Sequence, residues 1–395
     1  MTVRNGREFL SIPGPTTVPD EVLQAMHRPA VEIYSGALKN TTLSCLDDLR
    51  WLFKTTGDTY IFASNGHGAW EAALTNVFSK GEKVLVLESG RFAIGWGEAG
   101  AKLGIEVEIL PGKEGHAVSI EAFEARMRQD SAGEIKAVLV VQIDTASSVY
   151  NDIAAIRGAL DAAGHEALLM VDTIASLGIV DFRMDDWGVD VTVGGSQKGL
   201  MVPPGLSFNA VSAKAKAIHQ TAGLKTSYWD WTMRDGEEHY NKFAGTPPVH
   251  LLFGLRKALD MLKSEGLENV FLRHSLLAEA VRRAVQVWSQ ANVLSFVIEN
   301  PDERADSVTA VELSGDYNAA ELLEYCDTKC GVIVGRGIGE NGDTKFRIAH
   351  MGHINAPMIL GTLSVIEIGF GALGIPHGKG GVQAAIDWLA EKVTP

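Results

Sequence analysis

Hydrophobic and polar positions alternate between two patterns along the first part of the chain. Short apolar runs are separated by longer segments in which apolar residues recur every three to four positions. The first pattern predicts buried strands and the second predicts amphipathic helices. Because strands alternate with helices, the sequence favours a parallel, doubly wound α/β sheet. The expected strands are residues 60–63, 81–88, 107–110, 137–143, 167–171, 189–193 and 206–212.

The pattern changes after residue 248. Two strongly helical segments, 249–264 and 267–290, are followed by short strands at 293–298, 307–313, 331–335 and 345–350 and by helices at 319–326, 355–369 and 382–393. The length of 395 residues suits two domains. We predict an arm over residues 1–20, a large domain over 21–265, and a linker helix with a smaller α+β domain over 266–395.

Two segments lack either pattern and are predicted as loops. Residues 144–148 are short and polar, whereas residues 227–246 are rich in aromatic and charged side chains. A connection as long as the second is uncommon in a compact domain unless it is functional.

The composition is that of an ordinary soluble globular protein, with 46% hydrophobic and 21% charged residues. The net charge of −14 disfavours nucleic-acid binding. Cys45, Cys326 and Cys330 have no paired spacing, which favours a reducing compartment. No secretory signal is recognisable, and the apolar segment 358–375 contains Glu367 and is short for a membrane span. We therefore expect a cytoplasmic protein that binds neither nucleic acid nor membrane.

Two charged residues follow neighbouring strands in the middle of the chain. Asp172 comes directly after the run 167–171, and Lys198 follows the run 189–193 after Gly-Gly-Ser-Gln. In open α/β sheets, ligands bind at the carboxyl ends of the strands. Pyridoxal phosphate requires an amine that forms a Schiff base and a carboxylate that keeps its pyridinium nitrogen protonated. A strand-end Asp and a solvated Lys are more common, but the flanking glycines let the backbone approach a cofactor.

The stretch 167–205, with its Ser-Gln-Lys motif and upstream Asp, resembles the cofactor-lysine region of the class V aminotransferases. The similarity is greatest to the alanine/serine–glyoxylate aminotransferase group of fold type I pyridoxal phosphate enzymes. The motifs IPGPTTVP, SNGHGAWEAALTN, GLENVFLRH and FRIAHMGHIN have counterparts in the same order, so the resemblance covers nearly the whole chain. It implies a large, mostly parallel sheet domain and a smaller C-terminal α+β domain.

The residues after the first expected strand open a helix, and the amides at a helix start suit a phosphate. A helix start alone is weak evidence of a phosphate site, but the resemblance implies that Asn65, Gly66 and His67 belong to the family's phosphate site. It also implies that Phe92 stacks on the pyridine ring, although core packing is the usual fate of a Phe. Gln197, beside the lysine, is expected to contact the cofactor.

The loop 144–148 departs from the family pattern of Glu-Thr-Ala/Ser-Thr-Gly. The resemblance implies that Thr145 hydrogen-bonds the phenolic oxygen of the cofactor. Asp144 replaces the usual Glu, and Ser148 replaces the usual Gly. Because this loop lies near the reacting carbon in relatives, the departures leave the substrate open.

The resemblance implies two further contacts. Thr246 is expected to bind the cofactor phosphate of a partner subunit, which predicts a homodimer with shared active sites. Gly245 stands where relatives often have Tyr, which would widen the pocket. Arg347 would otherwise be a strand Arg facing solvent, but its planar guanidinium matches an α-carboxylate, and its motif matches the family's carboxylate-binding Arg.

Two other patterns are weaker evidence of a binding site. The run Gly-Arg-Gly-Ile-Gly at 335–339 is similar to a dinucleotide fingerprint but lies late in the chain without a following helix, so we predict a turn. His350 and His353 lack a third ligand at a suitable spacing, so no metal site is predicted.

These observations predict a pyridoxal-phosphate-dependent transamination between serine, alanine or aspartate and a 2-oxo acid, with glyoxylate the expected acceptor, by a ping-pong mechanism. Lys198 would be the base that moves the α-proton, and Asp172 would support the electron sink. Alternatives are another pair, such as pyridoxamine and pyruvate, or a cysteine desulfurase using Cys326 or Cys330. A non-catalytic scaffold is disfavoured because Asp172, Lys198 and Arg347 occur together.

Overall fold

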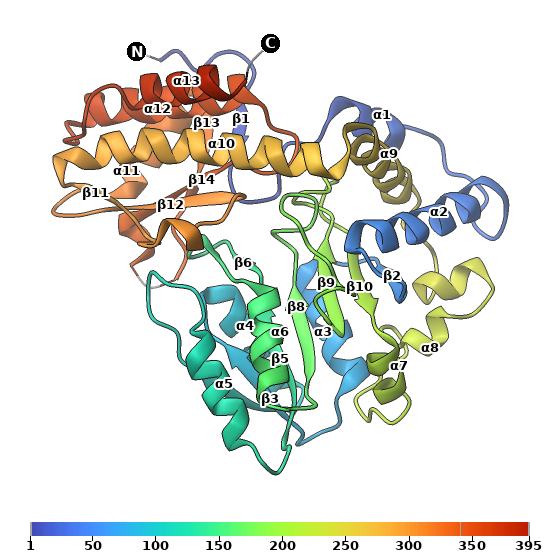
Figure 1. The fold of residues 1–395 in the computed structure, drawn as a ribbon. Coiled ribbons are helices and arrows are strands. Elements are labelled where there is room, and N and C mark those ends of the chain that lie inside the picture. The colour runs from blue at the N-terminus through green and yellow to red at the C-terminus, as the bar shows by residue number, and fades with distance from the viewer. Residues whose placement is uncertain (1, 340, 394–395) are drawn as a thin grey trace.

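The computed structural model describes residues 2–339 and 341–393. It consists of a large domain built on a seven-stranded sheet and a smaller domain built on a five-stranded sheet. The long helix α10 (Leu267–Trp288) begins next to the large domain and runs across the smaller one (Figure 1).

The large sheet has the strand order β2-β10-β9-β8-β5-β3-β4. Neighbouring strands from β9 to β4 are parallel, and β10 is antiparallel to both β9 and β2. The predicted doubly wound, mostly parallel sheet is therefore confirmed. Its strands are β2 (Asp58–Phe62), β3 (Lys83–Leu87), β4 (Glu106–Leu110), β5 (Ile135–Val141), β8 (Leu168–Asp172), β9 (Val191–Gly195) and β10 (Ser207–Val211).

Helices cover both faces of this sheet, which explains why its central strands are apolar at nearly every position. In β8, Leu169 and Val171 face one core and Leu168 and Met170 face the other. The first core includes α1 (Asp20–Met26), α2 (Gly36–Phe53), α5 (Ile120–Gln129), α6 (Ile153–Ala162) and α9 (Val249–Glu265). The second includes α3 (Gly66–Val77), α4 (Arg91–Lys102) and α7 (Ala213–His219).

The small sheet has the order β1-β13-β14-β12-β11. Its edge strand β1 comes from the N-terminal arm and pairs parallel with β13. The elements are β1 (Phe9–Ser11), β11 (Leu294–Phe296), β12 (Val308–Leu313), α11 (Ala319–Tyr325), the π-helical turn η4 (Cys326–Cys330), β13 (Val332–Arg336), β14 (Lys345–Ala349), α12 (Ala356–Leu373) and α13 (Gly381–Lys392). Short 3-10 turns are η2 (Ser289–Ala291), η3 (Pro301–Glu303) and η5 (Gly342–Thr344).

Helix α12 is the one helix in residues 2–339 and 341–393 that is long and apolar enough to cross a membrane, by length and composition alone. Its residues Ile359, Leu363, Ile366 and Phe370 are buried in the core of the small domain. The helix packs against α13 and α10, as the core helix of a globular domain does.

Both predicted loops contain ordered elements. Residues 143–150 form a hairpin of β6 (Ile143–Asp144) and β7 (Val149–Tyr150). The segment 227–246 contains α8 (Trp231–Arg234) and the 3-10 helix η1 (His239–Phe243). The segment is therefore more ordered than the predicted loop: Trp231 and Arg234 are buried, and the Arg234 guanidinium donates to the carbonyls of Ile61, Lys242 and Tyr228. Likewise, Gly335 and Arg336 end strand β13 before the predicted turn.

Candidate active site

A cavity of about 270 Å³ lies where the carboxyl ends of β5, β8 and β9 meet the start of α3 and the N-terminal arm. The sequence-predicted residues that line it are Asn65, Gly66, His67, Phe92, Thr145, Asp172, Gln197 and Lys198. Thr246 and Arg347 are not among its lining residues.

Asp172 is the last residue of β8 and is only 3% exposed. Its Oδ1 accepts the backbone N–H of Ile174 at 2.7 Å, and its Oδ2 accepts the indole N–H of Trp70 at 2.6 Å. Burial raises the pKa of this carboxyl to about 7, against the effect of the two donors. A cation bound in the cavity would hold the side chain in its charged form.

Lys198 lies beyond the end of β9, and its Nζ donates to the carbonyl of Pro13 in the arm. Burial, and then the positive charge of Arg347, lowers the pKa of Lys198 to about 8. An amine with such a pKa is largely available as a nucleophile in mildly alkaline solution. The arm passes so close that a Cβ at Gly14, where φ is +95°, would lie 2.6 Å from Lys198 Cε. Only glycine fits at that position.

The opposite end of the cavity is formed by the N-terminus of α3. Asn65 caps the helix, and its side-chain oxygen accepts the backbone N–H groups of His67 and Gly68. No acidic residue lies in the first turn. Burial lowers the pKa of His67, so its ring is neutral at physiological pH. The helix dipole, together with a backbone N–H of the first turn that the Asn65 side chain does not bind, makes this end of the cavity suitable for an anion.

Phe92 is half-buried at the start of α4, and its ring lines the cavity. The preceding Gly90 supplies no side-chain cap, and the carboxylate of Asp144 takes this role from the hairpin. Asp144 Oδ2 accepts the N–H groups of Phe92 and Ala93, and Oδ1 accepts that of Ala146. A Cβ at Gly90 would lie 2.4 Å from Asp144 Cγ, so the glycine permits this approach.

Arg347 lies on β14, 6% exposed, behind the arm. It lines a neighbouring cavity that shares Gly14 with the first. Its Nε donates to the carbonyl of Arg336 and its Nη1 to that of Thr145, both at 2.7 Å. Burial lowers the pKa of Arg347 to about 10, so it stays charged at neutral pH. In the part of the chain that the structure describes, Nη2 has no hydrogen-bond partner, which leaves one side of the guanidinium free.

Comparison with known proteins agrees with this geometry. A model of the family described as "Aminotransferase class-V" matches residues 9–342. The chain belongs to the class V aminotransferases. It is 38% identical to the serine–glyoxylate aminotransferase of Methylorubrum extorquens, over 99% of this chain and 98% of that protein. It is also 38% identical to the L-aspartate–glyoxylate aminotransferase of Paracoccus denitrificans, over 95% and 94%.

Solved structures share the fold of this aminotransferase over its full length. The pyridoxamine–pyruvate aminotransferase of Mesorhizobium loti superposes with a TM-score of 0.89 at 26% sequence identity, covering 100% of both chains. The fold type I architecture expected from the sequence is thus confirmed.

Membership of the class V aminotransferases implies pyridoxal phosphate, and the cavity fits this group. Gln197 Oε1 is buried at the wall without a hydrogen-bond partner in the described part of the chain, so a ligand donor would satisfy it. The amine, the carboxylate, the aromatic ring and the helix N-terminus supply the four kinds of contact that the aldehyde, the ring nitrogen, the ring face and the phosphate need.

Two residues of this aminotransferase site were missed by sequence reasoning. Asp144 was noted only as a departure from the family pattern, and its capping of α4 depends on a contact 52 residues away in sequence. Trp70 lies one turn into α3 and was not singled out. Because a buried Trp usually has a hydrogen-bond partner for its N–H, a Trp in a helix next to the predicted phosphate site was a possible indication of a polar contact there.

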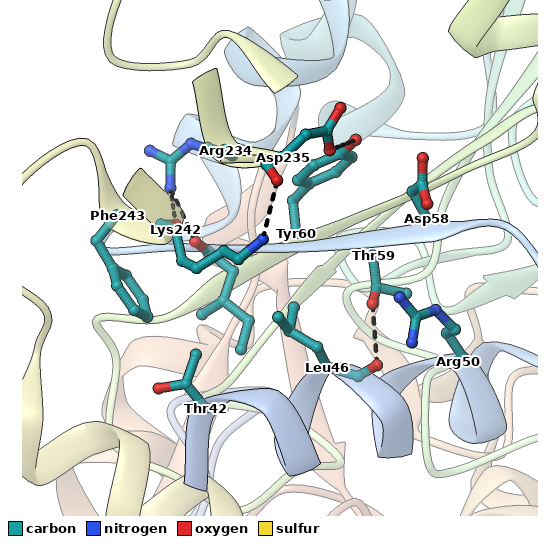
Figure 2. A pocket seen from close by; sticks show the side chains of 11 residues that line it. Thr42, Leu46, Arg50, Asp58, Thr59, Tyr60, Arg234, Asp235, Lys242 and Phe243 are labelled. Carbon is teal, nitrogen blue, oxygen red and sulfur yellow. Dashed lines mark hydrogen bonds between the residues drawn. The ribbon is translucent and has the colours of Figure 1, made fainter. Parts of the chain in front are cut away.

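A second cavity, of about 330 Å³, lies at the outer edge of β2 beneath α8 and η1. Figure 2 shows its polar groups bound to one another: Tyr60 donates to Asp235, and the Arg234 guanidinium donates to the Lys242 carbonyl. The carboxylate of Asp235 also pairs with Lys216. This cavity combines no buried free amine with a strand-end carboxylate, so it does not fit the cofactor of an aminotransferase.

Proposed function

We propose that this aminotransferase holds pyridoxal phosphate at Lys198 and transfers an amino group from serine, alanine or aspartate to glyoxylate, as a cytoplasmic homodimer. The observation that carries the proposal is the placement of Asp172 and Lys198 in one buried cavity with an aromatic ring and a helix N-terminus. When bound, pyridoxal phosphate supplies an electron sink for the bonds of the substrate's Cα.

The other steps of the reaction are assigned to residues of the chain. Lys198 Nζ removes the proton from the substrate's Cα, for which its lowered pKa suits it. Asp172 pairs with the positive ring nitrogen, Phe92 packs on the ring face, and the start of α3 binds the phosphate. Thr145 and Gln197 face the cavity, where they can contact ring substituents.

Arg347 is proposed to bind the α-carboxylate that every substrate shares. Its Nε and Nη1 bonds fix the guanidinium against two backbone carbonyls, while Nη2 has no hydrogen-bond partner among the described residues. A planar fork held in this way can accept a carboxylate in two parallel hydrogen bonds. Such binding orients Cα toward Lys198.

The alternatives are less well supported. Pyridoxamine carries no phosphate, whereas the start of α3 is built for an anion. A desulfurase would need a mobile thiol, but Cys326 is buried in the core of the small domain, where burial raises its pKa to about 12. Cys330, in the π-helical turn, does not line the cavity. Relatives acting on serine or aspartate with glyoxylate support the proposed substrates.

The exposed surface supports a homodimer. Half of the exposed large apolar side chains of the described residues lie within residues 23–43 and 228–240, namely Leu23, Val31, Tyr34, Leu43, Tyr228, Met233 and Tyr240. These segments comprise parts of α1, α2, α8 and η1 and the connections next to them, and α1, α2 and α8 lie on one side of the large domain (Figure 1). Thr246 is exposed just after η1. We propose that this face meets a second copy and that Thr246 reaches the partner's cofactor phosphate.

A steady-state screen tests the function directly. Purified protein with pyridoxal phosphate is assayed with serine, alanine, aspartate, cysteine and pyridoxamine as donors, each against glyoxylate and pyruvate. We expect the highest kcat/KM for one of the first three donors with glyoxylate. Faster turnover of pyridoxamine with pyruvate, or release of sulfide from cysteine, would refute the proposal.

A further inference from the structure

Trp70 and Asp172 form a buried pair beneath the cofactor cavity. The indole Nε1 donates to Asp172 Oδ2 at 2.6 Å, and the two residues are 2% and 3% exposed. An indole N–H is a donor only, so it can bind the charged carboxylate or an unprotonated oxygen but can never accept the acid proton. Hydrogen bonds to an ionised acceptor are short and about twice as strong as neutral ones.

We propose that Trp70 is a positioning residue that holds Asp172 in its charged form and aims it at the ring nitrogen of pyridoxal phosphate, so that the shared proton stays on the ring. This inference rests on the proposed function. The carboxylate and the pyridine nitrogen would compete for one proton in a buried site, and each N–H donated to the carboxylate weakens its hold on that proton.

The surroundings of Asp172 make this donor necessary. Burial raises the pKa of the carboxyl, and the nearby charge of Asp144 raises it further. The charge of Lys198 opposes this effect only while the amine is protonated and free. Two N–H groups act in every state of the site: the backbone N–H of Ile174 and the indole of Trp70. Of these, the indole is the side-chain group, and it can be removed without changing the backbone.

The chain supplies a matched control. Trp96 stacks on Trp70 with ring centroids 6.2 Å apart and an interplanar angle of 16°. It is completely buried in the same core, and its Nε1 has no hydrogen-bond partner within the described residues. Trp70→Phe and Trp96→Phe therefore remove the same volume from one cluster of side chains. Only the first removes an N–H from Asp172.

The decisive measurement is the ¹⁵N chemical shift of holoenzyme loaded with pyridoxal phosphate labelled at the ring nitrogen, because this shift reports where the proton lies. We expect the Trp70→Phe signal to move toward that of neutral pyridine, while Trp96→Phe keeps the wild-type value. In parallel, Trp70→Phe should lower kcat about tenfold and leave KM unchanged, since loss of one charge-assisted bond is worth about one unit of pKa.

A second substitution guards against a folding defect. Replacing the Trp70 indole by benzothiophene keeps the shape and puts sulfur in place of the N–H. This variant should show the same ¹⁵N displacement as Trp70→Phe. An unchanged shift in both Trp70 variants, or an equal displacement in Trp96→Phe, would overturn the inference. If Asp172→Asn also leaves the ring signal of the wild type unchanged, the assignment of Asp172 itself fails, which separates the two proposals.

Discussion

The carboxylate of Asp144 accepts the backbone N–H of Phe92 at 2.8 Å, which ties the β6–β7 hairpin to the first turn of α4. Asp144→Ala should lower the free energy of unfolding by about 1 to 2 kcal/mol, as loss of a helix cap does. It should also weaken cofactor binding, because Phe92 loses its fixed position. Asp144→Asn should fall between, since its amide nitrogen cannot accept a bond.

Urea unfolding of the apoenzymes and titration with pyridoxal phosphate measure both effects. The control is Asp152→Ala, which removes the cap of α6 away from the cavity. If Asp144→Ala weakens cofactor binding no more than this control, the hairpin does not position Phe92.

The pKa of Lys198 predicts how fast apoenzyme takes up the cofactor. Only the unprotonated amine attacks the aldehyde, so the rate should rise with pH through a midpoint near the pKa of about 8. Arg347→Met removes a positive charge that lowers this pKa, so its midpoint should move to higher pH. Stopped-flow absorbance gives both midpoints. A midpoint that stays in place in the variant would show that the Arg347 charge does not reach Lys198.

The proposed dimer predicts complementation between two defective subunits. Lys198→Ala removes the amine, and Thr246→Ala removes the group proposed to reach the neighbouring phosphate. A mixed dimer has one site in which both residues are intact, so mixing should restore activity at limiting cofactor concentration. The heterodimers are isolated with two affinity tags before assay. Well-folded heterodimers that stay inactive would count against a shared site.

Arg347 separates substrate binding from cofactor chemistry. Lysine supplies charge without the planar fork, and if two of its three N–H groups bind the carbonyls of Thr145 and Arg336, only one is left for a carboxylate. Arg347→Lys should leave the cofactor absorbance intact and lower kcat/KM for all amino and oxo acids by about 2 to 4 kcal/mol. A primary amine without a carboxylate is the control. An equal loss with this amine would mean that Arg347 supports the fold and that another cation binds the carboxylate.

The parts of the structure that the sequence predicted are those set by local pattern. The apolar run before Asp172 has to be a strand covered on both faces, and it ends where the first charge appears. Family motifs then located Lys198 and the start of α3. The hairpin was missed because its two-residue strands have no periodicity, and it is held by Asp144 and by the Ser148 Oγ bond from the N–H of Ala310 in the other domain.

Contacts between distant segments account for the rest. Ser148 has a φ of 67°, which favours glycine, and its place in the hairpin is bound to the small domain through that side-chain bond. The bond from Trp70 to Asp172 joins residues 102 positions apart. Arg234 lies in the segment predicted as a loop, yet three backbone carbonyls accept its hydrogen bonds in the interior. The local sequence around each of these residues does not indicate which distant residue it contacts.

The half-reaction with a single donor tests the central claim most directly. Holoenzyme free of oxo acid is mixed with one equivalent of serine, alanine or aspartate, the visible absorbance of the cofactor is followed, and [2-¹³C]glyoxylate is then added. The account predicts that the donor bleaches the visible band, that glyoxylate restores it, and that one labelled glycine forms per active site. Lys198→Ala should do neither at a comparable rate. A band unchanged by all three donors, or glycine formation that survives in Lys198→Ala, would contradict amino transfer at this site.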